Sequence, residues 1–192
     1  MKLLQIDSSL LGQNSASREL TAAIVARWQD AVPGLQLTYR DVDARPLAHL
    51  DGAALAKTDP VAAAEADQAM AEFLAADVVV IGAPMYNFSV PSTLKAWIDR
   101  VAVAGKTFRY TEKGPQGLAG GKKVIVASTR GGIHSGAESD FVEPYLRFLF
   151  GFLGVTDIEF ITAEGLAYSP EHRAQAMTAA LVAIPQPLAL AA

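Results

Sequence analysis

The sequence predicts a doubly wound α/β fold, in which five parallel strands lie in the order 2-1-3-4-5 and helices cover both faces of the sheet. The clearest observation is a run of four β-branched residues from Val78 to Ile81. A continuous apolar run this short is typical of a strand buried on both faces. Strand-like and helix-like segments also alternate along the whole chain without an internal repeat or linker, which favours right-handed crossovers and a single domain over 1–192.

The elements before the central strand follow from apolar spacing and turn residues. Leu20, Ile24 and Trp28 recur four residues apart, which indicates an amphipathic helix that ends before Pro33-Gly34. The expected elements are a strand over 2–7, a polar loop over 8–16, a helix over about 17–31, a strand over 35–39, and an alanine-rich helical region over 47–76, in one or two pieces broken near Asp59-Pro60, whose charged residues Glu65, Asp67 and Glu72 mark a solvated face.

The central strand is expected to end at Gly82-Ala83-Pro84, because Pro84 has no N–H to give to the sheet. Ser89 or Ser92 is the expected N-cap of the next helix, with Pro91 in its first turn. The remaining expected elements are a small hairpin strand over 107–111, a loop containing Pro115, a strand over 122–129, a helix over 141–153 with Pro144 in its first turn, a strand over 155–162, and a helix from about 170 that ends near Pro185 and Pro187.

Composition excludes several functional classes. The chain of 192 residues contains no cysteine, which excludes disulfides, thiolate catalysis and Cys-ligated zinc. Only three histidines are present, no two at ligand spacing, so no metal site is expected. A net charge of −4 argues against nucleic acid as a partner. No signal peptide or window of roughly 18 apolar residues is apparent, so we expect a cytoplasmic protein without a membrane partner.

Three of the expected strands end in unusual loops, and in this topology the loops after strands one, three and four lie side by side. The first carries Ser9, Ser15 and Ser17 before a helix, where hydroxyls and free N–H groups form an anion site. The loop over 84–88 places bulky side chains at a strand's carboxyl end, which indicates a flat aromatic ligand. The loop over 129–134 has adjacent glycines, whose N–H groups can approach a ligand closely.

Each loop also has a plainer interpretation. Serines before helices are mostly N-caps, a hydrophobic loop can cover a sheet end or contact another subunit, and paired glycines can form a tight turn. Other nucleotide-binding and hydrolase motifs do not fit. Gly121-Lys122 is followed by Lys123 rather than Ser or Thr, the first turn lacks G-x-G-x-x-G, and G-x-S-x-G is absent.

Four motifs occur in order over nearly the whole chain: Ser9 with Ser15-Ala16-Ser17, Ala83-Pro84-Met85-Tyr86-Asn87-Phe88, Thr107-Phe108-Arg109-Tyr110-Thr111, and Arg130-Gly131-Gly132-Ile133-His134. With them the chain resembles the FMN-dependent NADH:azoreductases, also called FMN-dependent NADH:quinone oxidoreductases, which have the flavodoxin-like fold. The resemblance implies a homodimer with its flavin sites at the subunit boundary.

The resemblance also implies a role for individual residues. The FMN phosphate would be held by Ser9, Ser15, Ala16 and Ser17, the isoalloxazine ring would lie against Pro84, Met85, Tyr86, Asn87 and Phe88, and the pyrimidine end would be bordered by Thr129, Arg130, Gly131 and Gly132. The substrate pocket would contain Asn87, Phe108, Tyr110 and Phe152. No catalytic side chain is implied, and His134 is either a proton donor, a brace for its loop or the cap of a neighbouring helix.

The implied reaction passes two electrons from NADH or NADPH through bound FMN to quinones or aromatic azo compounds, with ping-pong kinetics. The choice between NADH and NADPH and the natural acceptor stay open at this stage. Two alternatives also stay open: an FMN carrier or regulatory flavin-binding module without NADH turnover of its own, and an α/β binding protein that has lost its cofactor. Steady NADH oxidation with a quinone, and the colour of the purified protein, distinguish them.

Overall fold

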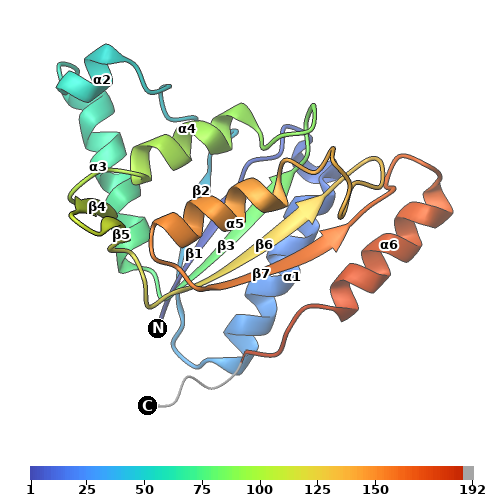
Figure 1. Cartoon of the computed structure of the whole chain (residues 1–192). Coiled ribbons are helices and arrows are strands. Elements are labelled where there is room, and N and C mark those ends of the chain that lie inside the picture. The colour runs from blue at the N-terminus through green and yellow to red at the C-terminus, as the bar shows by residue number, and fades with distance from the viewer. Residues whose placement is uncertain (188–192) are drawn as a thin grey trace.

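A five-stranded parallel sheet runs through the centre of the molecule in the order β2-β1-β3-β6-β7 (Figure 1). The computed structural model describes residues 1–187. The strands are β1 (Lys2–Asp7), β2 (Gln36–Asp41), β3 (Val78–Pro84), β6 (Lys123–Thr129) and β7 (Asp157–Ala163). Because β4 and β5 form a separate hairpin, this is the predicted order 2-1-3-4-5.

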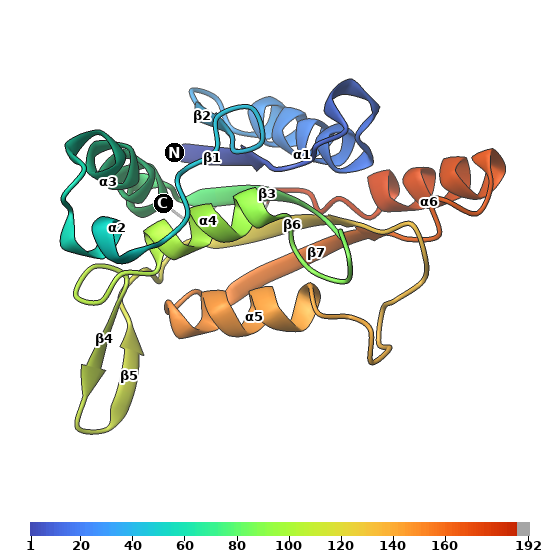
Figure 2. The ribbon, with the colours of Figure 1, turned by 90° about the horizontal axis from the view of Figure 1, so that it is seen from above.

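Helices cover both faces of the sheet, as Figure 2 shows from above. One face packs against α3 (Pro60–Ala75), α4 (Ser92–Val101) and α5 (Glu143–Phe152), and the other against α1 (Ala16–Ala31) and α6 (Pro170–Val182). All seven residues of β3 are buried, which is why its sequence is a continuous apolar run rather than an alternating one. The central strand therefore has a hydrophobic core on each side.

The structure confirms one prediction around the central strand and corrects another. The strand ends at Pro84, as expected, and Pro84 is paired there with Thr129. Proline is tolerated there because the next donor is the N–H of Met85, which bonds to the Thr129 carbonyl at 2.8 Å. Helix α4 is capped by neither Ser89 nor Ser92: its N-cap is Pro91, without a side-chain hydrogen bond.

A two-stranded hairpin, β4 (Phe108–Thr111) and β5 (Gly114–Gly117), projects from the body of the molecule (Figure 2). The segment around Pro115, predicted to be a loop, is in fact β5, and Pro115 lies opposite Tyr110. An edge strand can accept proline because its outer N–H positions need no partner. The hairpin base is fixed where Gly117 meets Gly154, since a side chain at Gly117 would come within 2.1 Å of the Gly154 backbone.

The alanine-rich region forms two helices, α2 (Gly52–Ala56) and α3, with the break near Asp59-Pro60 that was predicted. The Asp59 side chain caps α3 by accepting hydrogen bonds from Val61 and Ala62. Within residues 1–187, no helix combines the length and the apolar character needed to cross a membrane.

Candidate functional site

A cavity of about 330 Å³ opens at the carboxyl ends of the strands, where the loops after β1, β3, β6 and β7 meet. We call it the carboxyl-edge cavity. It brings together nine of the predicted cofactor-binding residues: Ser9, Ser15, Ala16, Pro84, Met85, Tyr86, Thr129, Arg130 and Gly131. The three loops that the sequence singled out therefore do lie around one space.

The serines of the β1–α1 loop and of the first turn of α1 contact one another, the α1 backbone and Tyr86. Ser15 is the N-cap of α1 and accepts a hydrogen bond from the Arg18 N–H at 3.3 Å. Its Oγ also lies 3.1 Å from the Oγ of Ser17, which is buried in the first turn of α1 and does not line the cavity. The Ser9 Oγ lies 3.0 Å from the Tyr86 hydroxyl, so a direct contact joins the first loop to the second.

An arginine clamp, Arg18 with Asp41, fixes this loop from behind. The Arg18 guanidinium bonds to both carboxylate oxygens of Asp41, at 2.6 and 3.0 Å, and donates to the Ser9 carbonyl at 2.9 Å. Burial alone would raise the pKa of Asp41, but the bonds from Arg18 and from the Ala44 N–H outweigh it and lower that pKa. The position of Ser9 is thus set by an ion pair that does not itself enter the cavity.

Asp7, the last residue of β1, is buried beneath the same loop. Thr21 donates to its carboxylate at 2.7 Å, and burial outweighs this bond and the charge of Arg18, so the pKa of Asp7 is raised. Gly82 leaves the space for this group: a Cβ there would lie 3.2 Å from Asp7 Oδ1 and 3.5 Å from Ser17 Oγ.

The loop after β3 is a tight turn with an unusual backbone. Tyr86 and Ser89 exchange two backbone hydrogen bonds, of 2.9 and 3.1 Å, and the two residues between them, Asn87 and Phe88, have φ angles of +48° and +68°. Positive φ at both central positions is typical of a type I′ turn, and it is strained for a bulky aromatic residue. Neither Asn87 nor Phe88 lines the carboxyl-edge cavity; Asn87 lines an adjoining cavity of about 470 Å³ together with Tyr86.

The loop after β6 is held by the loop after β7. Leu166 and Ala167 donate backbone hydrogen bonds to the carbonyls of Arg130 and Gly131, each at 3.1 Å. The Arg130 side chain is 0% exposed and pairs with Asp140 at 2.9 Å and Glu164 at 3.0 Å. Both ion pairs use Nη1, and the buried Nε and Nη2 have no hydrogen-bond partner among residues 1–187.

Glu164 organises the rest of this loop. One of its oxygens accepts hydrogen bonds from the N–H groups of His134 and Ser135, both at 2.8 Å. Burial of Glu164 acts to raise its pKa, but these bonds and the charge of Arg130 outweigh it and lower that pKa. His134 braces the loop: its Nδ1 lies 2.8 Å from Ser139 Oγ, and its ring packs edge-on against Phe88 at 5.8 Å.

The sequence predicted that the N–H groups of Gly131 and Gly132 approach a ligand. Among the residues 1–187, no group accepts a hydrogen bond from either glycine's N–H. Gly131 lines the cavity and Gly132 does not. A side chain at Gly132 would come within 2.9 Å of His134 Nε2, so the turn also needs glycine for close packing.

The predicted substrate-binding aromatics cluster with one another but not with the cavity. The Phe108 ring lies 4.6 Å from that of Phe152 and 5.6 Å from that of Tyr110. They belong to the projecting hairpin (Figure 2) and to α5, and none of them lines the carboxyl-edge cavity. Within one chain, the structure therefore does not bring these three aromatic residues to the predicted cofactor-binding residues.

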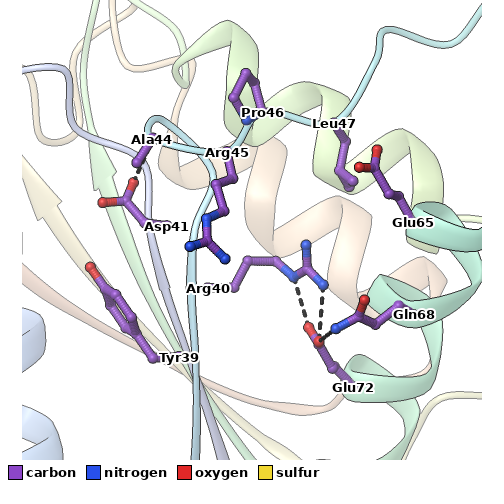
Figure 3. A pocket seen from close by; sticks show the side chains of 10 residues that line it. All are labelled: Tyr39, Arg40, Asp41, Ala44, Arg45, Pro46, Leu47, Glu65, Gln68 and Glu72. Carbon is purple, nitrogen blue, oxygen red and sulfur yellow. Dashed lines mark hydrogen bonds and ion pairs between the residues drawn. The ribbon is translucent and has the colours of Figure 1, made fainter. Parts of the chain in front are cut away.

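A larger cavity of about 640 Å³, here named the edge-strand cavity, lies beside β2 (Figure 3). Its polar groups largely satisfy one another: Arg40 pairs with Glu72 at 2.7 Å, and Gln68 donates to Glu72 at 2.9 Å (Figure 3). The prediction that Glu72 marks a solvated face is therefore wrong. This cavity contains none of the predicted site residues, so its size does not make it the functional site.

Five lining residues of the carboxyl-edge cavity were not predicted: Leu11, Asn14, Leu166, Ala167 and Arg173. Leu166 and Ala167 are held at the cavity by backbone hydrogen bonds, and their side chains gave no indication of this in the sequence. Arg173 lies in the first turn of α6, and its charge at a helix start, where cations are disfavoured, was the available signal.

These features define a doubly wound α/β protein in which serine hydroxyls and a helix start lie beside an apolar wall at the carboxyl ends of the strands. Residues 1–187 match a family model described as "Flavodoxin-like fold". The FMN-dependent NADH:quinone oxidoreductase of Stenotrophomonas maltophilia (strain K279a) is 60% identical over 185 residues, covering 96% of this chain and 95% of the relative. FMN-dependent NADH:quinone oxidoreductase 3 of Pseudomonas fluorescens (strain Pf0-1) is 53% identical over the full length of both chains.

Among solved structures, an azoreductase from Bacillus anthracis str. Sterne superposes with a TM-score of 0.86 at 29% identity, covering 95% of each chain. The chain belongs to the family of FMN-dependent NADH:quinone oxidoreductases. The family, the class of enzyme and the fold that the motifs predicted are thereby confirmed.

Proposed function

We propose that the protein binds FMN in the carboxyl-edge cavity and transfers two electrons from NADH or NADPH to quinones, with aromatic azo compounds as further acceptors. The observation that carries this proposal is the lining of the cavity. Serine hydroxyls at a helix start, an apolar and aromatic wall and a glycine turn surround one space, and over residues 1–187 no carboxylate lines it. An anion with a flat apolar part suits that lining.

The residues fit the parts of FMN. Ser9, Ser15 and the free N–H of Ala16 at the start of α1 suit the phosphate. Met85 and Tyr86, held by the extended end of β3, offer a wall for the ring. Ser17, which is buried against Ser15, would support the phosphate site through its neighbour.

When bound, FMN supplies the electron-transfer chemistry, accepting two electrons from a nicotinamide and passing them on. The N–H groups of Gly131 and Gly132 would stabilise negative charge at the pyrimidine end of the ring. Preorganised donors of this kind contribute about 2.7–4 kcal/mol each. Tyr86 and Asn87 line the adjoining cavity, where the nicotinamide and the acceptor would bind in turn. Because one place serves both reactants, we expect ping-pong kinetics, with substrate protons from water.

The substrate pocket would be completed by a second copy of the chain. Tyr110 is 75% exposed at the hairpin, and with Phe108 and Phe152 it lies outside the cavity of its own subunit. In the proposed homodimer the hairpin of one subunit would lie against the flavin site of the other. Light scattering measures the mass of the protein in solution and so tests whether it is a homodimer. Tyr110→Ala is expected to lower kcat/KM for quinones while the Kd for FMN stays unchanged.

The decisive experiment is to purify the protein, record its visible spectrum and measure NADH and NADPH oxidation with a panel of quinones and azo dyes. Parallel lines in double-reciprocal plots are the ping-pong result. A yellow protein with negligible oxidation unless a separate reductase is added would indicate an FMN carrier. A colourless protein that releases no flavin on denaturation would contradict the proposal.

A further inference from the structure

We propose that Arg173 is the cation that pairs with the phosphate end of the bound flavin nucleotide, a role that rests on the FMN site proposed above. Arg173 lies in the first turn of α6 and lines the carboxyl-edge cavity together with Ser15 and Ala16 at the start of α1. Helices α1 and α6 pack against each other on the same face of the sheet (Figure 1). Their two starts therefore reach the cavity from neighbouring positions.

The charges around the cavity single out this residue. Two arginines, Arg130 and Arg173, line the cavity. The Arg130 guanidinium is enclosed and already paired with Asp140 and Glu164. Arg18, behind the first loop, is likewise occupied by Asp41. Within the described part of the chain, Arg173 is the lining cation that no carboxylate neutralises.

The serine loop needs such a charge. A phosphate monoester carries about −1.5 to −2 charges at pH 7. Ser9 and Ser15 offer only neutral hydroxyls, and the start of α1 adds a partial charge of about +0.5. A guanidinium supplies a full charge and charge-assisted hydrogen bonds, which are roughly twice as strong as neutral ones.

The position of Arg173 in its own helix gives independent support. Ser169 caps α6, and Glu171 in the first turn complements the positive end of the helix dipole. A cation at Arg173 opposes that dipole, so the stability of α6 does not explain it. A negative ligand in the cavity would.

The test compares FMN with riboflavin, which has the same ring and ribityl chain but no phosphate. Binding to the apoprotein is measured by quenching of flavin fluorescence. Arg173→Gln is expected to raise the Kd for FMN by roughly tenfold to a hundredfold and to change the Kd for riboflavin by less than about twofold. Arg173→Lys should recover most of the FMN affinity, because it restores the charge.

The matched control is Arg45→Gln, which removes the same charge from the edge-strand cavity (Figure 3) and should leave both Kd values unchanged. Wild-type FMN affinity should also fall with added salt more steeply than that of Arg173→Gln. Thermal unfolding of each apoprotein verifies that it is folded. If Arg173→Gln does not fold, the assignment is tested instead by comparing the salt dependence of the FMN Kd between Arg173→Lys and wild type.

Two outcomes would overturn the assignment while leaving the proposed FMN site intact. Equal weakening of FMN and riboflavin would place Arg173 at the ring or in a purely structural role. Wild-type FMN affinity in Arg173→Gln would show that the phosphate does not use this charge. A wild-type protein that does not bind FMN at all would instead refute the proposed function, and the assignment with it.

Discussion

Replacing Glu164 by glutamine tests how the glycine turn at the cavity is held in place. Glu164 is 17% exposed and bonds to the guanidinium of Arg130 and to two backbone N–H groups through one oxygen. Breaking a buried ion pair from one side costs about 3–5 kcal/mol. Arg130 keeps its partner Asp140, so we expect the lower end, about 3 kcal/mol at pH 7.

The assay is denaturant unfolding of wild type and Glu164→Gln at several pH values. The folded-state pKa of Glu164 is lowered from an ordinary 4.5, so its stabilising contribution is fully present above pH 4.5 and is lost as the pH falls through the lowered value. The stability gap between the two proteins should therefore shrink in acid. In thermal unfolding at pH 7, about 3 kcal/mol corresponds to a fall of roughly 6–12 °C in Tm for a chain of this size.

Glu138→Gln is the matched control, because Glu138 is exposed and lies in the loop after β6 that contains the glycine turn. It should change the unfolding free energy by less than about 0.5 kcal/mol. A Glu164→Gln protein as stable as this control, or a gap that does not change with pH, would mean that the carboxylate does not hold the turn.

Three further substitutions test other parts of the site. Gly117→Ala should lower the unfolding free energy by at least about 3 kcal/mol in denaturant titrations, because its Cβ would meet the Gly154 backbone; a loss below about 1 kcal/mol would contradict this. Phe88→Gly should be more stable than Phe88→Ala by about 1 kcal/mol, since both lack the ring and only glycine accepts a φ of +68° without strain; equal stabilities would argue against the strained turn. Ser15→Ala should lose about 1 kcal/mol of stability with the cap to Arg18, and should weaken FMN more than riboflavin; an equal effect on both ligands would leave only the cap.

The sequence predicted those parts of the fold where the residue types themselves indicate burial and secondary structure. A β-branched run buried on both faces can form little else than a central strand, and β3 is that strand. The sheet order followed because alternating strands and helices permit few right-handed arrangements. The break at Asp59-Pro60 was predictable because aspartate is a favoured N-cap and proline is a favoured first residue of a helix.

The errors arose where backbone bonds from distant segments decided the structure. Strand β5 forms around Pro115 because β4 pairs with it, although glycine and proline favour a loop. Pro91 precedes α4 without a side-chain cap, and Ser89 is instead engaged with the backbone of Tyr86.

The sequence predicted which loops form the candidate site, but not the ion pairs that hold these loops in place. Serines, aromatic residues and paired glycines can be recognised in a sequence by their chemistry. The clamp of Arg18 on Asp41 joins residues 23 positions apart, and that of Arg130 on Glu164 joins residues 34 apart. Nothing local marks either pair, since each arginine is one of 16 basic residues in the chain.

The arginine clamp of Arg18 and the similar clamp of Arg130 with Asp140 and Glu164 also determine the electrostatics of the cavity. Arg18 faces Asp7 and Asp41, and Arg130 faces Asp140 and Glu164, so each arginine is surrounded by two carboxylates. With every group ionised, each clamp carries one excess negative charge just behind a loop that lines the cavity. Burial lessens this at the first clamp by raising the pKa of Asp7, which makes that group easier to neutralise. The remaining field opposes an anionic ligand, and a cation inside the cavity opposes that field. The clamps that position the loops thus create the need for the charge that we assign to Arg173.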